Sequence, residues 1–332
     1  MKKIVAFLLL ACMMLSLAAC GASATAEYKL GMGVSLSTDS SKDNQAQVDA
    51  TVATVVTDKD GKIVLCRLDV AQSKMDVTGG AVEADKTFKT KMELGDDYGM
   101  VAYGNAIAEW YDQAKAFESY VVGKTAAEVE GIETVVNDTG HNVATDEALL
   151  AGCTMDITAF KAAVVKACND EKGASFKAGK DFTLGVAAIT EAADSTPVGE
   201  KDAQVKMYTN YGAAVVDKDG KILAALTDAT QPVITADKDG KITDATFKGT
   251  KRELGADYGM VAYGNAIAEW DAQAKAFADY TVGKTASEVA GLETVVNDSG
   301  HNVTTDETLL ASCTMDISGM MAVIALAATY AR

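Results

Sequence analysis

The chain contains one long unit twice, and this duplication limits its possible folds more than any other feature. Residues 91–158 and 251–318 align without a gap at an offset of 160, and 53 of the 68 paired positions are identical. Each copy has a common domain size, and two copies at this spacing indicate tandem domains rather than a solenoid. We therefore predict repeat domains at 28–168 and 181–332, joined by a polar linker at 169–180.

The amino terminus has the composition of an export signal. Met-Lys-Lys precedes an apolar run at 4–17, which is too short to span a bilayer comfortably. The run ends in Leu-Ala-Ala-Cys20, which resembles the lipobox of bacterial lipoproteins. The resemblance implies a signal peptide at 1–19, a lipidated Cys20 and a tether at 20–27, at the outer face of the bacterial cytoplasmic membrane. A plain signal peptide with an unrelated cysteine is the alternative.

Charge and composition argue against two classes of ligand. The chain has 47 acidic and 30 basic side chains, and removal of the signal would leave 28 basic side chains and a net charge of −19. Nucleic acids need a basic face, so we expect none as a partner. Two histidines are too few for a multi-histidine centre, and we predict no metal ligands.

Each copy begins with patterns typical of strands. Strands are expected at 28–36, 48–57 and 62–70, with a turn at Asp58-Lys-Asp-Gly61. The second copy repeats the hairpin across 215–226 and adds another across 233–246 around Asp237-Lys-Asp-Gly240. These turns resemble the start of a calcium loop but lack its later ligands, so we interpret them as hairpin turns.

Helical spacing follows the strands. Ile107, Trp110, Ala114 and Phe117 would form one apolar helix face, with Asn105 as the N-cap. Shorter helices are expected from Thr125 and from Thr145, and a helix at 158–168 closes the copy. Strands followed by helices predict an α+β fold, with two tandem copies of an antiparallel sheet and C-terminal helices.

Several side chains have two interpretations. Cys66 and Cys168 form either a disulfide or two buried thiols. His141 is either a solvated loop residue or the base for a Cys153 nucleophile, and we predict no catalytic residue. Four tyrosines either line an aromatic ligand site or pack against the sheet edge: Tyr98, Tyr103, Tyr258 and Tyr263.

One short segment before the last helix of each copy points to a family. It reads Ala151-Gly-Cys-Thr-Met-Asp-Ile157 in the first copy and Ala311-Ser-Cys-Thr-Met-Asp-Ile317 in the second. Together with the earlier Asp-Lys-Asp-Gly-Lys-Ile turn, it resembles the extracytoplasmic FMN-binding domain family, whose motif is Ser-Gly-Ala-Thr-x-Thr/Ser. Here alanine replaces the first serine, cysteine the alanine and aspartate the last hydroxyl residue.

The resemblance implies an electron carrier rather than an enzyme. In the family the motif threonine can carry FMN through a phosphodiester bond, and lipoproteins with tandem domains of this kind pass electrons to redox partners outside the cell. The cofactor-binding residues implied here are Thr154, Thr314, Cys153, Cys313, Gly152 and Ser312. Asp156 and Asp316 would repel the phosphate unless they are turned away or paired. A surface or ligand-binding module without flavin is the alternative.

Overall fold

The computed structural model describes residues 25–332, so the predicted signal peptide and Cys20 lie outside the described residues. Seven strands form two antiparallel sheets at the centre. The first sheet has the order β3-β2-β1-β6 and the second has the order β10-β9-β7. Their strands are β1 (Ala26–Ser37), β2 (Gln45–Thr57), β3 (Ile63–Asp76), β6 (Ala174–Ala178), β7 (Phe182–Glu191), β9 (Tyr208–Asp217) and β10 (Ile222–Thr230).

Helices follow the strands in each copy. The first copy has α1 (Lys91–Leu94), α2 (Met100–Gly104), α3 (Trp110–Val121), α4 (Ala126–Glu130), α5 (Glu147–Leu150) and α6 (Thr158–Cys168), with a small hairpin of β4 (Thr134–Val136) and β5 (Asn142–Ala144). The second has α7 (Lys251–Leu254), α8 (Met260–Gly264), α9 (Trp270–Thr281), α10 (Ala286–Ala290), α11 (Glu307–Leu310) and α12 (Ser318–Thr329), with β13 (Thr294–Val296) and β14 (Asn302–Thr304). The predicted α+β fold in two tandem copies is confirmed.

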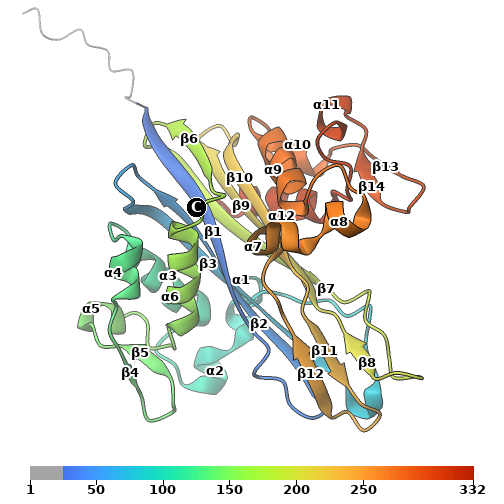
Figure 1. The fold of residues 1–332 in the computed structure, drawn as a ribbon. Coiled ribbons are helices and arrows are strands. Elements are labelled where there is room, and N and C mark those ends of the chain that lie inside the picture. The colour runs from blue at the N-terminus through green and yellow to red at the C-terminus, as the bar shows by residue number, and fades with distance from the viewer. Residues whose placement is uncertain (1–24) are drawn as a thin grey trace, which may run out of the picture.

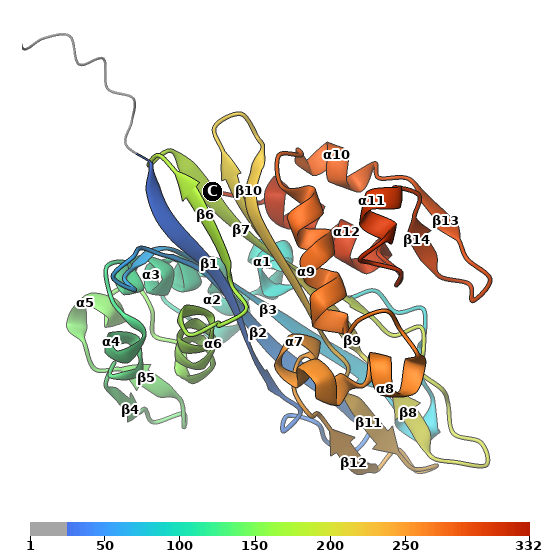
Figure 2. The same ribbon diagram turned by 45° about the horizontal axis from the view of Figure 1, so that its top comes forward.

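The layers run helix, sheet, sheet, helix (Figures 1 and 2). The inner faces of the two sheets share one core that includes Leu30, Val52, Leu184 and Tyr211. On the outer faces, α3 and α6 cover the first sheet, and α9 and α12 cover the second. Because the inner core draws residues from both copies, the two repeats are packed into one body.

A third sheet closes one end of the body. It has the order β12-β11-β8, formed by β8 (Ala203–Val205), β11 (Val233–Ala236) and β12 (Ile242–Thr246). Its buried residues pack against the ends of β2 and β3, through Val48 and Met75. The corresponding stretch of the first copy, 77–90, holds only a short turn of 3₁₀ helix at Thr78–Gly80.

The hairpin turns match the sequence prediction. Asp58 Oδ1 accepts hydrogen bonds from the backbone N–H groups of Asp60 and Lys62, and Gly61 has φ 74°. The turn at Asp237-Lys-Asp-Gly240 repeats this geometry between β11 and β12. Each turn aspartate thus orders its own loop, as an ordinary Asx turn does. Within residues 25–332, no group of three or more His, Cys, Asp or Glu side chains is placed to hold a metal ion.

The start of the long helix was predicted wrongly. Asn105 does not cap α3 but ends α2 in the left-handed conformation, with φ 51°. Glu109 stands at the N-cap of α3 instead, and Ile107 is 57% exposed rather than part of the buried face. The apolar pattern misled because Ile107 is apolar but faces solvent, whereas Trp110, Ala114 and Phe117 are buried.

Other helix limits agree more closely. Thr125 caps α4 with a complete capping box, and α6 spans the predicted residues 158–168. Asp146, one residue after the predicted Thr145, caps α5. The predicted linker at 169–180 contains β6, which pairs with β1 and so extends the first sheet. Among the described residues, no helix is both long enough and apolar enough to cross a bilayer.

Candidate functional site

The turn that carries Thr154 lies between α5 and α6, on the outer side of the first sheet (Figure 1). Its equivalent around Thr314 lies between α11 and α12. Both threonines are partly exposed.

A buried glutamine fixes each threonine. Gln113 on α3 has no exposed surface, and its Oε1 accepts hydrogen bonds from Thr154 N at 2.9 Å and Thr154 Oγ1 at 3.2 Å. Its Nε2 donates to the carbonyl of Ala108 at 2.8 Å, so one side chain ties the turn to the loop before α3. Gln273 repeats these bonds with Thr314 at 2.9 and 3.4 Å and with Ala268 at 2.8 Å. Neither glutamine was predicted as a site residue, although a polar residue on an apolar helix face in both copies was a signal.

The aspartate beside each threonine is paired with backbone. Asp156 accepts hydrogen bonds from Asn142 N and from Thr158 N, each at 2.8 Å. Burial raises the pKa of Asp156, but these hydrogen bonds outweigh it and the pKa lies below its usual value. Asp316 makes the same two bonds, to Asn302 N and Ser318 N. Each carboxylate therefore stays ionised and serves the first turn of the last helix.

The cysteine of each motif points into the protein. Cys153 and Cys313 have no exposed surface and belong to the outer cores. Burial raises the pKa of Cys153, and it raises the pKa of Cys313 to about 11. A thiolate is therefore disfavoured at both positions, which argues against a nucleophile. His141 is exposed in the loop between β4 and β5.

The remaining motif positions lie at the rim of the turn. Gly152 packs closely on α3, since a Cβ there would lie 2.8 Å from the Cβ of Ala116. Ser312, its equivalent in the second copy, is exposed, and its hydroxyl donates to the carbonyl of Leu309 at 3.2 Å. Away from the site, Cys66 and Cys168 are free thiols, and burial raises the pKa of both.

Exposed apolar side chains gather in two segments that are hydrogen-bonded to the turn, here called its flanks: α2 with the loop that follows it, and the hairpin of β4 and β5. Gln113 joins the turn to the loop that follows α2, and Asn142 joins it to the hairpin of β4 and β5. Among the described residues, fourteen large hydrophobic side chains are exposed, and ten of these lie in the two flanks of the two copies. The ten are Val101, Tyr103, Ile107, Val135, Val136, Val261, Tyr263, Ile267, Val295 and Val296. Such a concentration beside a polar turn is typical of a binding surface.

The four tyrosines divide into two pairs. Tyr98 and Tyr258 pack against the outer cores, where Lys91 and Lys251 lie 4.7 and 4.8 Å from their ring centroids. Tyr103 and Tyr263 are 91% and 92% exposed. The second pair therefore presents far more of its surface to solution than Tyr98 and Tyr258, which are partly buried.

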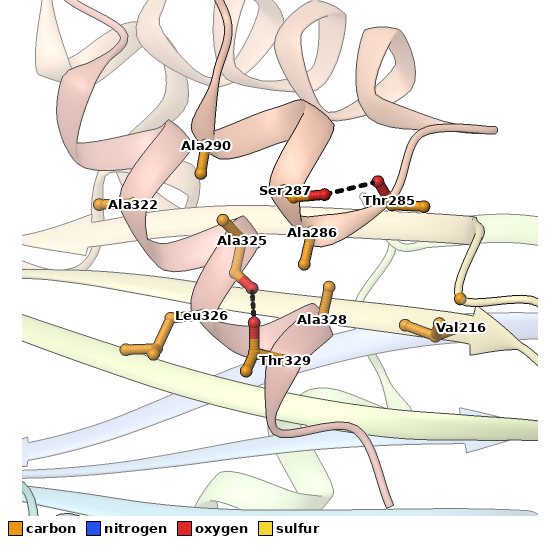
Figure 3. A pocket seen from close by; sticks show the side chains of 11 residues that line it. Val216, Thr285, Ala286, Ser287, Ala290, Ala322, Ala325, Leu326, Ala328 and Thr329 are labelled. Atoms are coloured by element: carbon orange, nitrogen blue, oxygen red, sulfur yellow. Dashed lines mark hydrogen bonds between the residues drawn. The ribbon is translucent and has the colours of Figure 1, made fainter.

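A separate hollow of about 610 Å³ lies between the β9–β10 hairpin, α10 and α12 (Figure 3). Alanines dominate its wall, and its hydroxyl groups are engaged: Thr329 donates to the carbonyl of Ala325, and Thr285 bonds Ser287. No charged side chain lines it, and Thr314 is not among its lining residues. We therefore place the candidate site at the threonine turns.

Comparisons with known proteins give one distant relative. No protein-family model matches the chain, and no solved structure matches it. A curated protein named chlorophenol reductase, from Desulfitobacterium hafniense, is 33% identical over 129 residues. The match covers 33% of this chain and 39% of that protein, so the chain spans well under half of the relative's length.

Proposed function

We propose that the protein carries FMN at Thr154 and Thr314 and acts as an electron carrier at the outer face of a bacterial cytoplasmic membrane. The two motif turns, one per copy, supply the attachment positions that the FMN-binding family implies. The name of the distant relative, a reductase, agrees with a redox role. Membrane attachment rests on Cys20 and its lipobox, and the acidic balance of the chain makes a lipid anchor necessary near anionic headgroups.

The observation that carries the proposal is the hydrogen bonding of the threonine. In its hydrogen bond with Gln113, Thr154 Oγ1 is the donor and Gln113 Oε1 is the acceptor. The same Gln113 oxygen also accepts a hydrogen bond from Thr154 N. Replacing the hydroxyl hydrogen by phosphorus would therefore leave the buried glutamine oxygen with a partner. An ester at Thr154 Oγ1 would turn this oxygen away from Gln113 and leave Gln113 Oε1 with one donor, Thr154 N.

Asp156, the acid next to the motif threonine, is paired, as a phosphate at this turn would require. Both oxygens of Asp156 accept backbone hydrogen bonds, which offset part of its repulsion of a phosphate. The same bonds place the carboxylate at the first turn of α6, where a free phosphate would otherwise bind. A covalent link through Thr154 is therefore favoured over a phosphate held only by the helix.

The residues of this chain would hold and surround the group. Thr154 and Thr314 would fix the phosphate end, and the exposed apolar flanks would cover part of the flavin. When bound, FMN supplies one- and two-electron transfer chemistry. The thiols of Cys153 and Cys313 lie in the core, so only the backbone of these residues is available to the cofactor.

A mass measurement tests the proposal directly. The full-length protein is purified from the membranes of its native host, and its visible absorbance and intact mass are recorded. We expect a yellow protein with one FMN phosphodiester per copy. Thr154→Ala and Thr314→Ala should each remove one increment, and the double variant both. Thr145→Ala and Thr305→Ala, exposed threonines at equivalent positions, should keep both.

A colourless wild-type protein with no flavin mass would overturn the proposal. The alternative, a binding module without flavin, is favoured by one observation: aspartate stands where the family has a hydroxyl residue. Under that alternative the wild type and the threonine variants would all be colourless and would all lack the flavin mass increment.

A further inference from the structure

Tyr103 and Tyr263 are held in place while almost fully exposed. Tyr103 is 91% exposed and lies at the end of α2, and the ring of Tyr263 is 92% exposed at the end of α8. A Cβ at Gly99 would lie 2.5 Å from Cδ2 of Tyr103, so the ring rests against the glycine backbone. Gly99 has φ 75°, and Gly259 has φ 81° with the same contact to Tyr263. Each ring is therefore seated on backbone that only glycine readily provides.

The loop that follows α2 is connected to the threonine turn through the side chain of Gln113. Ala106 N donates to the carbonyl of Met100, which closes the loop after α2. Two residues later, the carbonyl of Ala108 accepts from Gln113, which also holds Thr154. The threonine turn and the loop after α2 are thus joined through one side chain with no exposed area.

We propose that Tyr103 and Tyr263 bind the isoalloxazine ring of the flavin attached at the neighbouring threonine. This inference rests on the proposed function, and it names the residues that set the flavin's environment. The ribityl chain separates the ring of FMN from its phosphate, so the ring must lie on one of the flanks of the turn. Of the two flanks, the α2 side offers the phenol ring of Tyr103, whereas the hairpin side offers only the smaller imidazole of His141.

The two flanks differ in chemistry. The hairpin side presents Val135 and Val136 followed by a polar loop at 137–141. The other side presents Val101 and Tyr103 on α2 and Ile107 in the loop that follows, all three exposed. A planar aromatic ring gains most from an offset stack on another aromatic ring with apolar neighbours. Phenol side chains also quench flavin fluorescence by electron transfer, which gives the contact a spectroscopic signature.

The test compares flavin spectra of loaded full-length protein. Variants with both Tyr103 and Tyr263 changed to Leu, or both to Phe, are purified alongside wild type, with Tyr330→Leu as a control for an exposed tyrosine in the terminal turn. Flavin fluorescence is divided by flavin absorbance in each sample. We expect a several-fold rise in this ratio for the Leu variant, with a shift of the visible band. The Phe variant should also fluoresce more but keep the band position, because it retains the stack.

The outcomes separate the inference from the proposed function. An unchanged ratio and band in a fully flavinylated Leu variant would overturn the tyrosine contact and leave the flavin proposal intact. Absence of flavin from the wild type as well would overturn both. Because the two side chains are more than nine-tenths exposed, the variants are expected to fold normally.

Discussion

Arg252 of the second copy holds Asp170, which follows the last helix of the first copy, through hydrogen bonds of 3.0 and 3.2 Å. Both side chains are 9% exposed, and the backbone N–H of Met32 also donates to Asp170. The first copy has Met92 at the position of Arg252. The two copies therefore differ at a residue that joins them.

Replacing Arg252 by Met, the residue of the first copy, should lower the free energy of unfolding by about 3 kcal/mol. The reason is that Asp170 would remain as a buried carboxylate without its cation. Urea denaturation measures the change. Lys275→Met removes the exposed pair of Lys275 with Asp279 and should cost less than about 1 kcal/mol. Equal losses for the two variants would contradict the role of the buried pair.

A second contact between the copies should show a measurable coupling energy. Arg332 donates to both oxygens of Glu118 at 3.0 and 2.9 Å, and Glu118 is 2% exposed. Arg332 is 39% exposed, so solvent screening limits the expected coupling to about 1 kcal/mol in a cycle of Glu118→Ala and Arg332→Met. Additive losses of stability would show that the two side chains act independently. The second copy has Ala278 at the position of Glu118.

The sheets and the last helix of the first copy were predictable because local rules govern them. Gly61 and Gly240 occupy the positive-φ positions that their hairpins need, and α6 begins and ends as its pattern indicates. The packing of two sheets around one core was not predictable, since each copy alone has the length and the pattern of strands and helices expected of a complete domain. It depends on pairs such as Arg252 with Asp170, which are distant in sequence and absent from the other copy.

The candidate site was only partly predictable. The motif named Thr154, but its contact with Gln113 spans 41 residues and leaves no local pattern. Periodicity assigned Ile107 to the core because the pattern records apolar character and not exposure. An exposed apolar residue near a site can have the same sequence spacing as a buried helix face. Only the tertiary structure shows which of the two it is.

Asp228 should make stability depend on pH. It is 4% exposed, and burial raises its pKa from 3.8 to about 6 despite nearby Arg252. Between about pH 4 and pH 6 the folded state therefore binds more protons than the unfolded state, and stability falls as pH rises through this window. Across this window the free energy of unfolding falls by on the order of 3 kcal/mol because of Asp228. Asp228→Asn keeps an acceptor for Arg252 N, so its stability relative to wild type should rise between pH 4 and pH 7.

Asp237 provides a control of opposite sign for this measurement. Hydrogen bonds from the backbone of Lys241 and Asp239 lower the pKa of this exposed turn aspartate. The ionised Asp237 carboxylate therefore stabilises the folded state above the pKa that it has in the unfolded chain. This stabilisation is lost as pH falls through its lower pKa in the folded state. Asp237→Asn should therefore lose stability relative to wild type at neutral pH, the opposite of Asp228→Asn. Parallel pH profiles for the two variants would contradict the burial argument.

Gln113→Leu should destabilise the protein by about 2 to 4 kcal/mol and loosen the threonine turn. Leucine has nearly the same volume but cannot accept from Thr154 N or donate to the Ala108 carbonyl, so two backbone groups near the core lose their partner. Chemical denaturation gives the loss of stability, and amide hydrogen exchange at Thr154 reports the turn itself. Lys115→Leu, a change at a partly exposed position on the same helix, should shift stability by less than about 0.5 kcal/mol and leave this exchange unchanged. Gln273→Leu should reproduce the effect at Thr314 alone. Unaltered exchange at Thr154 in Gln113→Leu would mean that the glutamine does not hold the turn.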